Sequence, residues 1–203
     1  MANVDAAFGM KPVRYLSGKA YTGASIPCYL PGTASIYAYV GDPVKKVNTG
    51  TNAAEASAPG VGTIQAGVMP IVAPIAATDP IFGVVVGVAA NPDALGTRHI
   101  AAAGSGIVFV ATEPDLVYEI QESGASTLAA TSAGLNASVT VAAGSSATGQ
   151  SAVELDNTSA AASASLELMI IGLSNKADNA LGANAVWEVT INNSQLGNKA
   201  LGI

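Results

Sequence analysis

The sequence has a single cysteine, few charged residues and few aromatic residues. Cys28 has no second cysteine to pair with, which excludes a scaffold held together by disulfides. Charged residues make up 11% of the chain and aromatic residues 5%, whereas soluble proteins carry about 25% charged residues on average. The chain is nevertheless not of the disordered class, because 50% of its residues are hydrophobic. Low charge and 22 glycines favour a β protein that is secreted or built into an assembly.

The few charges are unevenly distributed along the chain. The formal net charge is −6 and the isoelectric point about 4.5, which argues against a nucleic-acid partner. Residues 1–19 hold Lys11, Arg14 and Lys19 against Asp5, a net charge of +2. The remainder holds the other five of the 8 basic residues and thirteen of the 14 acidic ones, a net charge of −8. This asymmetry suggests two parts with different partners.

No long uninterrupted apolar run is present. The most apolar stretch, 68–90, is broken by Pro70, Pro74 and Pro80. A membrane-spanning helix needs about 20 consecutive apolar residues, so we expect no membrane partner. The first residues contain no apolar region of secretory length, which predicts a protein that is not exported by a standard signal.

Apolar and polar side chains alternate in two C-terminal segments. In 186–192, Trp187, Val189 and Ile191 share one face, which is typical of a half-buried strand. Residues 165–171 alternate in the same way, with Leu166, Leu168 and Ile170 predicted to point inward.

Other segments also favour strands. Residues 81–88 are apolar on both faces, which predicts a central strand with Gly83 and Gly87 at bulges or close contacts. Residues 107–110 and 116–120 flank a turn-forming tetrad and are predicted to form a hairpin.

The overall pattern indicates the fold class. Residues 35–40 and, more weakly, 138–141 are predicted as further strands, and long Gly, Ala and Ser loops separate the elements. Helical periodicity extends over no more than about two turns. The sequence therefore predicts an all-β body, either a barrel or a sandwich.

The N-terminal residues differ from this body. They mix apolar side chains with Lys11, Pro12 and Arg14 and show no clean period. Such a segment cannot fold alone and is either a frayed terminus or an extended arm that becomes ordered on a partner. We therefore expect an N-terminal arm, residues 1–22, and a single β domain, residues 23–203.

Side chains suited to catalysis are scarce. His99 is the only histidine, and one histidine with one cysteine cannot make an ordinary zinc site. Cys28 lies on a short apolar segment, where a buried and inert thiol is usual. The glycine spacing of 144–149 fits a phosphate-binding loop, but Gln150 stands where that motif needs lysine. We expect no enzyme activity, no cofactor, no metal and no small-molecule substrate.

The densest acidic group consists of Glu113, Asp115, Glu119 and Glu122. Paired carboxylates could serve a glycosidase. A solvated face of the predicted hairpin is the favoured interpretation.

Several blocks of the sequence resemble one protein family. They are MANVDAAFGMKPVRYLSG, IYAYVGDPVKKV, FGVVVGVA, EPDLVYEIQE and LELMIIGLSNKADNALGANAVWEVTINNSQL. In this order they are similar to the capsid cement, or decoration, proteins of tailed-bacteriophage heads. The resemblance implies a virion protein on the outer surface of the capsid, assembled in the host cytoplasm. It implies a homotrimer at local three-fold positions that clamps neighbouring major capsid protein subunits.

The resemblance also implies which residues contact the capsid. Phe8 and Tyr15 would be apolar anchors, and Arg14 would be a bidentate donor. The full set of expected capsid contacts is Phe8, Lys11, Pro12, Val13, Arg14 and Tyr15. An alternative from another class is a carbohydrate-binding or adhesin-type surface module that uses exposed tyrosines and the acidic group.

Overall fold

The computed structural model describes residues 3–32, 37–47 and 56–197. Strands dominate these residues, and their one helical element is the short 3-10 helix η2 (Ala130–Ser132), so the all-β prediction is confirmed. The strands are β1 (Lys11–Tyr15), β2 (Ile26–Leu30), β3 (Pro43–Lys46), β4 (Ala56–Ala58), β5 (Gly62–Ile64), β6 (Val72–Pro74), β7 (Gly83–Val88), β8 (Gly106–Ala111), β9 (Leu116–Gln121), β10 (Asn136–Ala137), β11 (Val139–Thr140), β12 (Glu154–Leu155), β13 (Leu168–Leu173) and β14 (Val186–Ile191).

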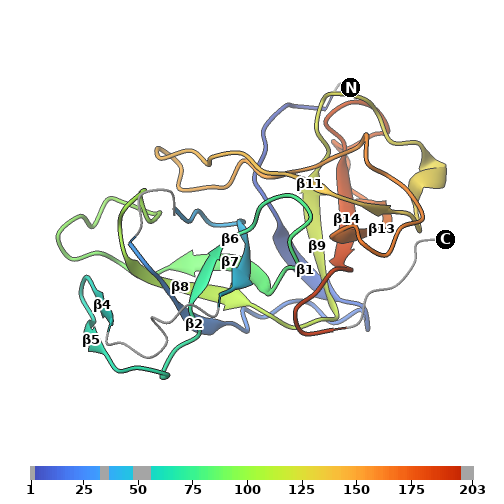
Figure 1. Ribbon diagram of the computed structural model, residues 1–203. Coiled ribbons are helices and arrows are strands. Elements are labelled where there is room, and N and C mark those ends of the chain that lie inside the picture. The colour runs from blue at the N-terminus through green and yellow to red at the C-terminus, as the bar shows by residue number, and fades with distance from the viewer. Residues whose placement is uncertain (1–2, 33–36, 48–55, 198–203) are drawn as a thin grey trace.

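The first sheet has the strand order β1-β9-β14-β13-β10, and all neighbouring strands are antiparallel (Figure 1). Its inner face carries Tyr118, Ile170, Trp187 and Val189, each at most 1% exposed. The predicted inward faces of the two C-terminal strands are thus confirmed at these positions. Thr190, on the opposite face, is also buried, and its hydroxyl is satisfied there by donating to the carbonyl oxygen of Leu116 at 3.1 Å.

The second sheet has the order β2-β8-β7-β3-β6, which places β7 in the centre as predicted. The register of β7 shifts between Val85 and Gly87, which is a bulge at a predicted glycine. Gly83 packs so closely on β8 that a Cβ there would collide with the carbonyl oxygen of Ala111.

This second sheet is rolled on itself. Tyr29 of β2 forms a parallel bridge with Ile71, next to β6, and its N–H donates to the carbonyl oxygen of Pro70 at 2.9 Å. The two outer strands therefore meet, and the interior holds a second core of Cys28, Leu30, Val44, Val72, Phe82, Val85, Val108 and Val110.

The rolled sheet packs against the first sheet in the manner of a sandwich. Val84 and Ala111 of the rolled sheet belong to the same hydrophobic cluster as Tyr118 and Trp187 of the first sheet. Figure 1 shows the two sheets side by side, with the β4–β5 hairpin at the end of the rolled sheet that lies away from the first sheet. A third, smaller cluster of apolar residues includes Ala58 and connects that hairpin to the rolled sheet.

The predicted hairpin of 107–110 with 116–120 is wrong. β8 pairs with β2 and β7 in the rolled sheet, whereas β9 pairs with β1 and β14 in the first sheet. Residues 112–115 therefore carry the chain from one sheet to the other. Alternation identifies each strand, but a turn-forming sequence suits a crossing between sheets as well as a hairpin.

Two shorter predictions were only partly met. Residues 35 and 36 of the predicted strand 35–40 lie outside the described residues. The rest of it forms two isolated bridges, Ala38 to Ile100 and Val40 to Gln150, because its neighbours on either side are loops. The weak segment 138–141 contributes the two-residue strand β11, which pairs with β12.

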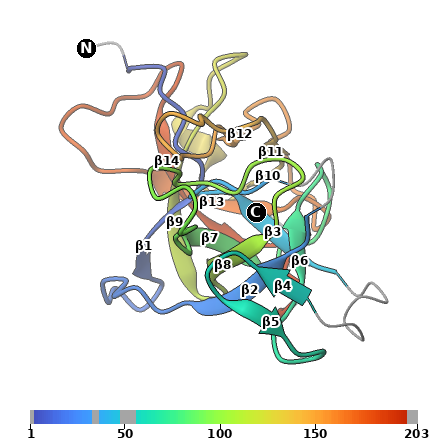
Figure 2. The same ribbon diagram turned by 90° about the vertical axis from the view of Figure 1, so that its left-hand side faces the viewer.

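The N-terminal segment, which we define as residues 3–22, lies on the body. Its strand β1 is the outer strand of the first sheet and pairs with β9. Met10, just before β1, is 1% exposed and belongs to the main core. Figure 2 shows the segment running beside β14 and β9 before it enters β1. A deletion of this segment would therefore also remove part of the core.

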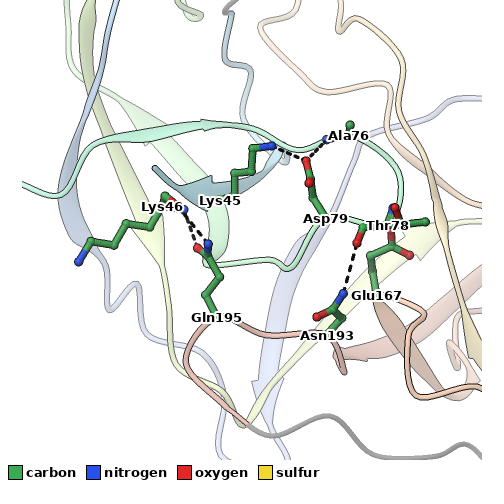
Figure 3. A network of polar contacts seen from close by, with 8 residues as sticks. All are labelled: Lys45, Lys46, Ala76, Thr78, Asp79, Glu167, Asn193 and Gln195. Carbon is green, nitrogen blue, oxygen red and sulfur yellow. Dashed lines mark hydrogen bonds and ion pairs between the residues drawn. The ribbon is translucent and has the colours of Figure 1, made fainter. Parts of the chain in front are cut away.

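Polar side chains near β3 join the two sheets (Figure 3). Gln195 binds the backbone of Lys46 at both ends of its amide, accepting the N–H at 2.6 Å and donating to the carbonyl oxygen at 3.1 Å. Lys45 forms an ion pair with Asp79 at 2.6 Å, and Asp79 accepts the N–H of Ala76 at 2.7 Å.

The same junction extends to the first sheet. The buried Glu167 accepts the N–H of Thr78, and Asn193 donates to the carbonyl oxygen of Thr78 at 3.4 Å. The N–H of Ile81 donates to the carbonyl oxygen of Asn193 at 2.8 Å. These bonds tie the segment after β14 to the turn before β7.

Candidate functional site

The N-terminal segment is fixed to the first sheet by amide side chains. Gln121 donates to the carbonyl oxygen of Val4 at 2.7 Å and accepts the N–H of Ala6 at 3.0 Å. Asn3 donates to the carbonyl oxygens of Ala180 and Ala183 at 2.8 and 3.0 Å. Backbone groups of the segment are thus satisfied by the protein itself, which holds the segment in one place.

Before it enters β1, the segment contacts the rolled sheet where two glycines meet. The N–H of Met10 donates to the carbonyl oxygen of Gly41 at 2.9 Å, and both Gly9 and Gly41 have positive φ angles. Next to them, Asp42 is 3% exposed. Burial raises the pKa of this carboxyl to about 6, although hydrogen bonds from Ser151 and from the Tyr39 N–H favour the charged form.

A groove of about 450 Å³ opens beside this contact. Phe8, Lys11 and Pro12 line it from the N-terminal segment, and Tyr21 lines it from the turn after β1. Val86 lines it from β7 of the rolled sheet. The volume lies within the range of about 300–1,000 Å³ that is usual for binding sites, and most of the lining side chains are apolar.

Three charged side chains also line the groove. Lys176 forms an ion pair with Glu119 at 2.6 Å, and Ser174 donates to the other oxygen of Glu119 at 2.7 Å. The ammonium of Lys176 lies 6.0 Å from the centre of the Phe8 ring. Lys11 is exposed, and within residues 3–32, 37–47 and 56–197 its ammonium has no ion-pair partner. The groove therefore presents one unpaired positive charge beside an apolar surface.

The predicted contact residues do not all lie at this groove. Phe8, Lys11 and Pro12 line it, whereas Val13 and Tyr15 are not part of its lining. Arg14, expected to donate to a partner, instead forms an ion pair with Glu188 of β14 at 2.6 Å. Contact of these residues with a capsid subunit stays a prediction.

Tyr15 contributes to the fold around the turn after β1. Its ring packs on that of Tyr21, with the centroids 6.5 Å apart. A hydrogen bond from its hydroxyl to Glu113 raises the pKa of Tyr15 to about 12, because the neutral hydroxyl is the donor.

Sequence reasoning missed Tyr21, Val86 and Lys176 as groove residues. The concentration of tyrosines near the N-terminus was a signal for Tyr21. No local signal marks Val86 or Lys176, because they come from β7 and from the loop after β13, far from Phe8 in the sequence.

The acidic group Glu113, Asp115, Glu119 and Glu122 was predicted to form a solvated hairpin face. That prediction is wrong for two of these four residues. Glu119 is 6% exposed and Glu122 is fully buried. Glu122 accepts the N–H of Leu128 at 3.0 Å, and burial raises its pKa. These carboxylates are covered by the chain after β9 and β13, which the sequence pattern does not reveal.

Cys28 and His99 are not part of the lining of the groove. Cys28 is fully buried, and burial raises the pKa of its thiol to about 12, so the reactive thiolate is scarce at neutral pH. His99 stacks on Tyr39, with ring centroids 4.8 Å apart and planes 6° from parallel.

Among the described residues, no cluster of three or more His, Cys, Asp or Glu side chains could hold a metal ion. The same residues include no helix long and apolar enough to cross a membrane.

No family model, no curated protein and no solved structure matches this chain.

Proposed function

We propose that this protein is a structural protein of a tailed-bacteriophage head that binds the outer surface of the capsid and stabilises the shell. The observation that carries the proposal is the groove along the N-terminal segment, where Phe8, Pro12 and Lys11 form an apolar surface with one unpaired charge. Such a surface suits a protein partner, because apolar contacts supply affinity and the charge selects the partner. The resemblance of the sequence blocks to capsid cement proteins supports the same role.

The proposed mechanism is stabilisation by binding. A protein that binds the assembled shell and not its separated subunits stabilises the shell by mass action. The body suits this task because its N-terminal segment is held in place before binding, by Gln121, Asn3 and the contact of Gly9 with Gly41. A segment that is already ordered loses little conformational entropy when it binds. As a homotrimer at local three-fold positions, the protein would bridge neighbouring capsid subunits.

The structure gives less support to the alternative, a carbohydrate-binding or adhesin-type module. That alternative needs exposed tyrosines and an accessible acidic group. Tyr29, Tyr39, Tyr118, Glu119 and Glu122 are buried, whereas Tyr15, Tyr21, Tyr37 and Glu113 are half-buried and Asp115 is exposed. About half of the side chains that this alternative needs are thus inaccessible, and we propose the capsid role instead.

The copy number in purified phage particles tests the proposed function. Quantitative mass spectrometry should give about one copy of this protein for each major capsid protein subunit. Particles stripped of the protein should release their genome at a lower temperature, and adding the purified protein should restore the original temperature. A handful of copies per particle, or none, would contradict the proposal.

A further inference from the structure

We propose that the groove beside the N-terminal segment binds an extended segment of the capsid subunit that carries a carboxylate next to apolar side chains, with the carboxylate paired to Lys11. This proposal rests on the proposed function, because it takes the capsid subunit as the owner of the segment. The proposal adds the chemical character of the bound segment and names Lys11 as the residue that recognises it.

The charges around the groove determine which charge the bound partner should carry. Of the two lysines that line it, Lys176 is already neutralised by Glu119 at 2.6 Å. Glu119 has its other oxygen bound by Ser174, so it has little capacity left for a partner. Lys11 is exposed and has no ion-pair partner in the described part of the chain. A bound carboxylate would complete this site, whereas a bound cation would meet the unpaired positive charge of Lys11.

The apolar lining determines the rest of the partner. Phe8, Pro12, Tyr21 and Val86 face the groove, and none of them offers a charge. A volume of about 450 Å³ accommodates a few apolar side chains. In the proposal these side chains come from an extended segment, in which nearby positions supply both them and the carboxylate.

The neighbouring strand edge favours recognition through side chains over the addition of a strand. β1 is the outer strand of the first sheet, but Pro12 has no N–H to donate. Farther along, Ala20 bridges to Arg14, and the N–H of Tyr21 donates to the carbonyl oxygen of Val13 at 3.1 Å. The turn after β1 thus already covers part of this edge, which leaves little room for a partner strand.

A carbodiimide cross-link tests the pairing directly, because this reagent joins an amine to a carboxylate that it contacts. Purified particles are treated with the reagent, and cross-linked peptides are identified by mass spectrometry. We expect Lys11 to be joined to an aspartate or glutamate of the capsid subunit.

Matched charge variants measure how much the pairing matters. Lys11→Glu should bind stripped heads about tenfold more weakly than the unmodified protein, and Lys11→Arg should bind normally. Lys19→Glu is the control, because Lys19 is also exposed and in the same segment but lies outside the groove. Equal melting temperatures for the variants would show that folding is unaffected.

The possible outcomes separate the two proposals. If the unmodified protein binds heads but Lys11 forms no cross-link and Lys11→Glu binds equally well, this inference is overturned and the proposed function stands. If the unmodified protein does not bind heads, both are overturned. A small apolar acid retained in the groove, detected by native mass spectrometry of the purified protein, would also overturn the inference.

Discussion

Gly9 and Gly41 contact each other where the N-terminal segment meets the rolled sheet, and neither position has room for a side chain. A Cβ on Gly9 would lie 2.5 Å from the carbonyl oxygen of Gly41, and a Cβ on Gly41 would lie 2.6 Å from the carbonyl oxygen of Phe8. Their φ angles, +73° and +97°, are unfavourable for any other residue. This contact positions Phe8 and Met10, and with them one wall of the groove.

We therefore expect Gly9→Ala to lower the free energy of unfolding by about 3 kcal/mol, since it combines left-handed backbone strain with a clash. Gly18→Ala is the matched control. Gly18 has a φ of +84°, but nothing lies within 4 Å of a Cβ there, so its loss should be about 1 kcal/mol. Urea denaturation of both variants measures the difference. Equal losses would show that the close contact contributes nothing beyond the backbone.

The buried carboxyl of Asp42 predicts a dependence of stability on pH. Its pKa is raised from 3.8 to about 6 in the folded protein, so folding favours the protonated form. The contribution of the protonated carboxyl to the free energy of unfolding is fully present below about pH 3.8. It is lost as the pH rises through about 6. The ionisation of Asp42 therefore makes the free energy of unfolding about 3 kcal/mol lower at pH 8 than at low pH.

Asp42→Asn should remove this dependence, because an amide does not titrate and its oxygen can still accept the Tyr39 N–H. The stability of the variant relative to the unmodified protein should rise by about 2.5 kcal/mol between pH 4 and pH 8. Asp93→Asn, at an exposed position, is the control for replacing a carboxylate by an amide. A flat difference for Asp42→Asn in denaturation at several pH values would refute the prediction.

The amide of Gln195 predicts a local effect on β3. Gln195→Ala removes both of its bonds to the backbone of Lys46. Because the side chain is exposed, the loss should be about 1 kcal/mol. Hydrogen exchange should accelerate at the Lys46 amide and hardly change in β9. Leu196→Ala, at the exposed neighbouring position, should leave the exchange at Lys46 unchanged, and acceleration there too would contradict a specific role of the amide.

The sequence predicted individual strands better than their partners. Alternation identified 186–192 because one face of β14, with Trp187 and Val189, packs on the core. The apolar run identified 81–88 because Val84 and Val85 of β7 face two different cores. The hairpin prediction failed because the pattern of a strand is the same whichever strand it pairs with. Strand pairing is decided by contacts between distant parts of the chain, such as the pairing of β9 with β1 and β14.

The groove was predictable only in part, for the same reason. Phe8, Lys11 and Pro12 stood out because apolar and basic residues are mixed in one short segment. The burial of Glu119 and the pairing of Arg14 with Glu188 depend on residues that arrive from the C-terminal part of the chain. A sequence pattern gives the face of a strand on which a side chain lies, but not what covers that face.

The only tryptophan and the only cysteine report on the two cores separately, which tests the prediction of a single β domain. Trp187 lies in the core between the sheets, and Cys28 lies inside the rolled sheet. We expect both cores to unfold together, because Val84 and Ala111 of the rolled sheet belong to the core of Trp187 and because Gln195 ties β3 to the segment after β14.

Trp187 fluorescence and labelling of Cys28 by a thiol reagent should therefore give the same urea midpoint. Without urea the thiol should react very slowly, because it is buried and its pKa is raised to about 12. Labelling of Cys28 at a urea concentration where Trp187 fluorescence is still native would mean that the rolled sheet opens on its own, and residues 23–203 would then comprise two cooperative units rather than one.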